Sequence, residues 1–112
     1  MFDFIFDAIG ALFDMIGDLV AWVIDGIMSL AEFVVDYFKG LRLRKGRDIP
    51  FIADEKKIAD LIHKAPEKNV GIFEATYNED TGEIENYRAI EADAMDSQLK
   101  SVLGNEKLVV LS

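Results

Sequence analysis

Residues 2–38 read FDFIFDAIGALFDMIGDLVAWVIDGIMSLAEFVVDYF, and they decide the fold because they contain neither a proline nor a basic residue. Their acidic residues follow one another at intervals of 4, 7, 4, 7, 7 and 4, which are spacings that return to one side of an α-helix. The spacing predicts one long apolar α-helix that carries an acidic stripe. The stripe consists of Asp3, Asp7, Asp14, Asp18, Asp25, Glu32 and Asp36.

The apolar side of this predicted helix is too large for the rest of the chain to cover. At ~100° per residue, the acidic stripe spans roughly 80°, and apolar residues occupy nearly all of the remainder. The helix would be ~55 Å long, whereas a compact domain of this size has a radius of gyration near ~13 Å. We therefore expect lipid, other copies of the chain or a partner to contact this surface. The predicted contact residues are Phe6, Phe13, Trp22, Ile24 and Phe33.

Within this stretch, residues 16–27 read IGDLVAWVIDGI, and they resemble the centre of staphylococcal delta-haemolysin, a short amphipathic peptide that lyses membranes and self-associates. The resemblance covers about twelve residues, and the present chain lacks the lysines of that peptide. The resemblance implies lipid contact for the predicted helix.

A basic segment follows at residues 39–49, and we expect it to link the helix to a separate domain. Its bases are Lys39, Arg42, Arg44, Lys45 and Arg47, and residues 39–47 include no acid. Bases directly after an apolar segment follow the positive-inside bias of membrane proteins, so the C-terminal domain would be cytoplasmic if the helix spans a membrane. Two other interpretations stay open, a nucleic-acid-binding patch and a simple solvated linker.

Residues 50–112 are predicted to form a small acidic α+β domain that begins after the restricted Ile49-Pro50 step. Hydrophobic periodicity predicts a helix at 54–64, strands at 70–77 and 83–90, a helix at 93–103 and a strand at 107–111. The predicted fold class is therefore α+β. A long apolar helix over 1–38 precedes an α-β-β-α-β domain with a mostly antiparallel sheet.

The composition excludes several functional classes. The 112 residues include 21 acids and 12 bases, so the formal net charge is -9, and a nucleic-acid partner is not expected. With no cysteine and one histidine, the chain has neither a thiolate metal site nor a multi-histidine metal site. We therefore expect no metal, no cofactor, no small-molecule substrate and no enzymatic activity.

Together these features predict a homo-oligomeric protein located at a membrane. The helices would assemble with their acidic stripes facing water, as a cation-attracting pore or a membrane scaffold, and Asp14, Asp18 and Asp25 would attract the cations. One alternative is a soluble cytoplasmic assembly, such as a tube, a filament or a closed helical bundle, that needs no membrane. Another is a partner-binding module of the immunity-protein type, in which the acidic helix neutralises a basic partner.

Overall fold

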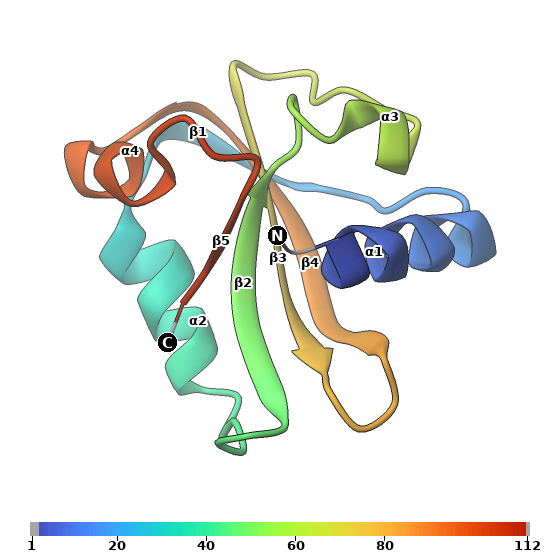
Figure 1. Ribbon diagram of the computed structural model, residues 1–112. Coiled ribbons are helices and arrows are strands. Elements are labelled where there is room, and N and C mark those ends of the chain that lie inside the picture. Colours follow the sequence, from blue (N-terminus) through green and yellow to red (C-terminus); the bar gives the residue numbers. More distant parts are fainter. Residues whose placement is uncertain (1–2, 112) are drawn as a thin grey trace.

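The computed structural model describes residues 3–111 and contains a mixed five-stranded β-sheet with helices on both faces (Figure 1). In their order across the sheet, the strands are β1 (Trp22–Met28), β4 (Glu83–Met95), β3 (Val70–Asn78), β2 (Asp48–Asp54) and β5 (Leu108–Val110). β1 runs parallel to β4, whereas the other three neighbouring pairs are antiparallel. β1 and β5 form the two edges of the sheet.

β3 is the central strand, and its sequence explains why both faces of the sheet are covered. Ile72 points to one face and Phe73 to the other, and both side chains are fully buried. Successive side chains of a strand point to opposite faces, so a run of apolar residues needs cover on both sides. The core therefore consists of two hydrophobic clusters, one on each face of the sheet.

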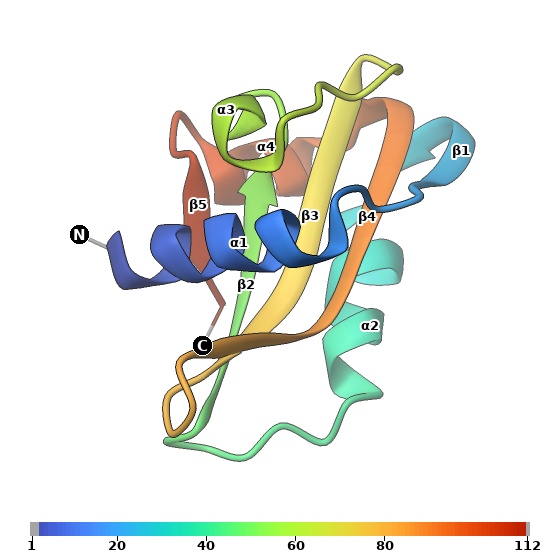
Figure 2. The same cartoon turned by 90° about the vertical axis from the view of Figure 1, so that its right-hand side faces the viewer.

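The first face is covered by α1 (Asp3–Ile16) and α3 (Ala59–Ile62), and Figure 2 shows α1 crossing the strands. Apolar residues of α1 recur every three or four positions and point toward the sheet. The buried ones are Ile5, Ile9, Leu12 and Phe13. The ring of Phe13 packs 5.5 Å from the ring of Phe73 on β3, measured between centroids.

The opposite face is covered by α4 (Ser97–Leu103) and by a second helical segment. This segment consists of one π-helical turn, η1 (Ala31–Val35), that continues directly into α2 (Asp36–Lys39). Together with the sheet, these helices enclose the second hydrophobic cluster. Its fully or nearly buried side chains include Val34, Phe38, Ile52, Ile72, Ile90, Leu99 and Leu103.

The prediction of one helix over residues 2–38 is wrong. α1 ends at Ile16, because Gly17 adopts a left-handed conformation (φ 80°) that favours glycine and closes a helix. Residues 22–28 then form β1, where β-branched side chains are favourable and a parallel partner is available in β4. The next helical turn belongs to η1, which lies on the opposite face of the sheet from α1 (Figure 1).

The apolar surface that was predicted to be too large for the chain to cover is therefore divided between two helices and a strand of one compact body. The radius of gyration is 13.1 Å, and the delta-haemolysin-like residues 16–27 comprise a helix end, a loop and most of β1. Across residues 3–111, no helix combines the length and the apolar character that crossing a membrane requires. Met1, Phe2 and Ser112 lie outside the described residues, so the first residue of the predicted helix is not tested.

Several predicted elements of the C-terminal half are present with different bounds. The two hairpin strands are confirmed as β3 and β4, and the last strand as β5. The helix predicted at 93–103 begins only at Ser97, because β4 continues further and Asp96 caps the helix with its carboxylate. Of the helix predicted at 54–64, only α3 is helical.

The Ile49-Pro50 step, expected to mark the start of the C-terminal domain, lies within β2 of the sheet. β2 lies between β3 and β5, so the boundary predicted at residues 49–50 falls inside a paired strand. Pro50 has no N–H to donate, but its carbonyl accepts a hydrogen bond from the Leu111 N–H, just beyond the end of β5. The expected mostly antiparallel sheet is also corrected to a mixed sheet, since β1 and β4 are parallel.

Candidate functional site

The seven predicted stripe residues are all exposed, but they lie on different elements. Three belong to α1, whereas Glu32 and Asp36 belong to the helical segment on the opposite face of the sheet. Asp18 lies in the loop after α1, and Asp25 lies on β1, where its carboxylate is 3.0 Å from Lys68 Nζ. Within residues 3–111, these carboxylates therefore form no single row or ring.

The five predicted contact residues also differ in their surroundings. Phe13 is buried against the sheet, and Phe6, Ile24 and Phe33 are half-buried. Trp22 is the one largely exposed member of this set, with 65% of its surface accessible. A partner would therefore meet Trp22 but not Phe13.

β1 carries the densest group of exposed apolar side chains in the described part of the chain. We call this group the β1 edge surface, and it consists of Val20, Trp22, Val23 and Ile27, which are at least 61% exposed. One edge of β1 pairs with β4, whereas no strand between residues 3 and 111 lies along the other edge. An open strand edge offers backbone hydrogen bonds, and a cluster of exposed apolar residues commonly marks a contact surface.

A β-bulge and the side chain of Lys68, which contacts both β1 and β4, hold β1 in place. The register between β1 and β4 shifts at Gly26, whose φ of 131° favours glycine. The Gly26 N–H donates to the Asp93 carboxylate at 2.9 Å, and Lys68 Nζ lies 3.0 Å from both Asp25 and Asp93. The hydrogen bond from Lys68 lowers the pKa of the Asp93 carboxyl. β1 is therefore a well-anchored edge.

Arg88 on β4 connects Trp22 to the sheet and to the helical segment. Its guanidinium lies 5.4 Å from the ring centroid of Trp22 and 3.9 Å from that of Tyr37 on α2, distances that suit cation–π contacts. Its Nε donates to the Glu74 carboxylate and its Nη2 to the Phe33 carbonyl, both at 2.8 Å. Burial raises the pKa of Glu74 to about 7, although Arg88 opposes that rise. This cluster fixes the position from which Trp22 meets solvent.

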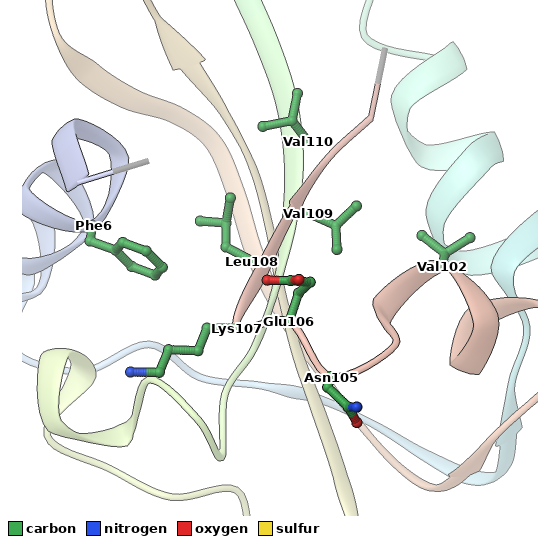
Figure 3. Close-up of a pocket in the computed structure, with 8 residues that line it drawn as sticks. All are labelled: Phe6, Val102, Asn105, Glu106, Lys107, Leu108, Val109 and Val110. Atoms are coloured by element: carbon green, nitrogen blue, oxygen red, sulfur yellow. The ribbon is translucent and has the colours of Figure 1, made fainter. Parts of the chain in front are cut away.

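A groove lies along β5, the edge of the sheet opposite to β1 (Figure 3). The groove has a volume of about 690 Å³ and runs beside β5. Figure 3 shows Phe6 of α1 on one side of β5 and Val102 of α4 on the other. This groove was not predicted, because its walls come from the two ends of the described chain.

β5 also has backbone groups that face away from β2, and no other strand within residues 3–111 pairs with them. The Lys107 carbonyl and the Leu111 N–H hydrogen-bond to β2. Consecutive residues of a strand direct their backbone groups to opposite sides, so those of Leu108 and Val110 face the groove. An extended peptide can therefore add a strand at this edge.

The predicted basic segment forms an exposed connection between α2 and β2, which we call the basic loop (residues 39–47). Arg47 is paired with Asp48 at 2.9 Å, and this hydrogen bond lowers the pKa of the Asp48 carboxyl. The other four bases are exposed and form no salt bridge within residues 3–111: Lys39, Arg42, Arg44 and Lys45. Four of the five bases of the basic loop are thus without a salt bridge in the described part of this acidic protein.

Two buried carboxyls, those of Glu55 and Glu91, lie close enough for the charge of Glu91 to raise the pKa of Glu55. Glu91 Oε1 accepts hydrogen bonds from the backbone N–H groups of Glu67 and Lys68, at 2.8 and 3.0 Å. Glu55 Oε1 has no hydrogen-bond partner among residues 3–111, and burial raises the pKa of this carboxyl to about 7. An acidic residue inside an apolar strand, as at Glu91, was the one sequence sign of this pair.

The described residues form three surface features: an apolar strand edge, a groove beside the opposite edge and a basic loop. From residue 3 to residue 111, no three His, Asp or Glu residues are grouped so that they could hold a metal ion. Comparisons of the chain with models of protein families, with curated proteins and with solved structures found no match.

Proposed function

We propose that the protein is a structural protein that associates with copies of itself along β1. The observation that carries this proposal is the open edge of β1 together with the β1 edge surface of Val20, Trp22, Val23 and Ile27. Two copies related by a two-fold axis would pair their β1 strands antiparallel and join their sheets into one. Each copy would then cover the apolar surface of the other.

Burial of the β1 edge surface supplies the main favourable free energy of this association. About 25 cal/mol is gained per Å² of apolar surface removed from water, and tryptophan is enriched among the residues that dominate interfaces. Arg88 already restrains the Trp22 side chain, so little conformational freedom is lost when a partner covers it. Strand pairing adds backbone hydrogen bonds and sets the orientation of the two copies.

Electrostatic repulsion opposes the association, because each copy carries a formal net charge of -9. Asp25 is the acidic residue of β1, and its ion pair with Lys68 reduces the repulsion at the contact. Like charges directly opposite one another are unfavourable, so we expect a register that keeps the two Asp25 side chains apart. Salt screens the remaining repulsion, and association should therefore strengthen as ionic strength rises.

This proposal keeps the predicted self-association and omits the predicted pore. A pore needed one apolar helix over residues 2–38, and α1 ends at Ile16. Partner binding is a second candidate function, favoured by the groove beside β5. There, the open backbone groups of Leu108 and Val110 would pair with an extended peptide from another protein.

Sedimentation velocity of the purified protein tests self-association. We expect a monomer–dimer equilibrium that shifts toward the dimer as protein or NaCl concentration rises. Val23→Lys places a charge on the contact and should lower the association constant at least about tenfold. Met15→Lys is the matched control, because Met15 is an exposed apolar residue (78%) on α1 and should leave association unchanged.

Chemical cross-linking locates the contact. The chain has no cysteine, so a single Val23→Cys variant treated with a short bifunctional maleimide reports contacts at that position alone. We expect covalent dimers from Val23→Cys and none from a matched Met15→Cys variant. A monomer at every concentration and salt level, or a dimer that Val23→Lys leaves intact, would show that β1 is not the contact.

A further inference from the structure

An apolar hollow lies beside the basic loop, on the edge of the sheet opposite to β1. Its volume is about 480 Å³. The apolar residues that line it are Leu43, Ile49, Pro50, Val110 and Leu111. Arg44 and Lys45 of the basic loop line it as well. A concave apolar surface of this size with a few polar groups is typical of a small-molecule site.

The charge at this hollow is positive. Asp48 also lines it, but its carboxylate accepts hydrogen bonds from the Arg47 side chain at 2.9 and 3.2 Å and from the Arg44 backbone N–H at 2.9 Å. The Arg44 and Lys45 side chains form no salt bridge within residues 3–111. Two uncompensated cations on a protein of net charge -9 favour a ligand that is anionic at one end.

A second apolar hollow adjoins the first. It has a volume of about 350 Å³ and shares Pro50 and Leu111 with the first hollow. Its other sides are lined by Leu30, by Val35, Phe38 and the base Lys39 of the helical segment, and by Val102 of α4. The two hollows together offer an apolar path that starts at the basic loop. Such a path suits an unbranched chain with an anionic head.

We propose that this site binds a single-chain anionic amphiphile, namely a long-chain carboxylate. Its carboxylate would lie at Arg44 and Lys45, and its chain would lie on Leu43, Ile49 and Leu111. Arginine can donate two parallel hydrogen bonds to a carboxylate, and lysine adds a second positive charge. Each further methylene that enters the hollows should raise the affinity about fourfold.

The shape of the site favours one ligand molecule over a bilayer surface. Docking on a bilayer needs apolar side chains that extend outward beside the bases. Leu41 and Leu43 of the basic loop are half-buried and pack against the core, and the neighbouring apolar residues line a concavity. The bases therefore border a space that an acyl chain can enter.

An NMR titration of the isotope-labelled full chain with sodium decanoate, below its micellar concentration, tests the proposal. We expect saturable chemical-shift changes centred on residues 43–49 and 110–111. Decanol has the same chain without the charge and should bind at least about tenfold more weakly. Octanoate lacks two methylenes and should bind about fifteenfold more weakly than decanoate.

Paired charge variants separate a local site from general charge attraction. Arg44→Gln/Lys45→Gln should weaken decanoate binding at least about tenfold and leave decanol binding unchanged. Lys56→Gln/Lys57→Gln removes two exposed lysines before α3, changes the net charge equally and should bind decanoate as the wild type does. Equal weakening by both double variants, or equal affinity for decanoate and decanol, would overturn the proposal. Absence of decanoate binding would also overturn it, and sedimentation with phosphatidylserine vesicles would then assign the basic loop to a bilayer surface.

Discussion

Replacement of Glu55 by glutamine should remove a loss of stability that occurs as the pH rises. Glu55 is 7% exposed, and its Oε1 atom has no hydrogen-bond partner within residues 3–111. Burial is the main cause of a pKa raised to about 7, the carboxylate of Glu91 adds to the rise, and Lys64 opposes it. Glutamine has nearly the same shape and does not titrate.

The size of this effect follows from the proton that the carboxyl binds. The folded protein retains the proton up to about pH 7, whereas the unfolded chain loses it near the ordinary pKa of 4.5. The stabilisation is therefore complete below pH 4.5 and is lost as the pH rises through 7. The difference between the two pKa values corresponds to about 3 kcal/mol in the free energy of unfolding.

Urea unfolding between about pH 4.5 and pH 8 measures this contribution. Over that range, the free energy of unfolding of the wild type should fall by about 3 kcal/mol more than that of Glu55→Gln. Glu74 titrates in both proteins, so the difference between the two pH profiles isolates Glu55. Glu67→Gln changes an exposed carboxyl nearby and should keep the wild-type profile. Parallel profiles for the wild type and Glu55→Gln would refute the reasoning.

Three further substitutions test the packing around the sheet by urea unfolding. Arg88→Gln should lower the free energy of unfolding by about 3–5 kcal/mol at pH 8, because it leaves the Glu74 carboxylate buried without a partner. Arg88→Met/Glu74→Leu should restore most of that loss. A double variant no more stable than the single one would contradict this explanation. Gly71→Ala should lower the free energy of unfolding by about 1–3 kcal/mol, because its new methyl group would lie 2.6 Å from Pro66 Cβ. An unchanged free energy of unfolding would show that the segment around Pro66 moves aside at no cost. Asp96→Ala removes the cap of α4 and should cost about 1 kcal/mol, a loss that Asp96→Asn should largely avoid.

The hairpin of β3 and β4 was predictable because the information that specifies it is local. Turn residues at 78–82 separate two strand-like runs, and Gly82 supplies the positive φ of 73° that the turn needs. The prediction for the N-terminal residues was wrong for a physical reason. Acids spaced by 4 and 7 stay on one side of a helix, but any element with a solvent-facing side also leaves its acids exposed. Gly17 and Gly26 both adopt positive φ, and their spacing alone did not reveal that the helix ends just before Gly17.

The candidate surfaces were partly predictable. The cluster of bases in the basic loop follows directly from the sequence, and Trp22 was predicted to be a contact residue. The adjoining hollow was not predictable, because β5 brings Val110 and Leu111 beside the loop through pairing with β2. The parallel contact of β1 with β4 is equally non-local, and it placed Trp22 on a strand edge where a helix was expected.

The parallel pairing of β1 with β4 also constrains when the chain can finish folding. During synthesis from the N-terminus, β1 leaves the ribosome long before β4 has been synthesised. The apolar residues of β1 therefore remain unpaired until β4 follows. Contacts between segments so distant in the chain form slowly. Because Trp22 is the one tryptophan and sits on β1, its fluorescence in stopped-flow refolding should change in the slowest phase. Translation speed and chaperone supply would then limit the yield of this protein more than the stability of its finished fold.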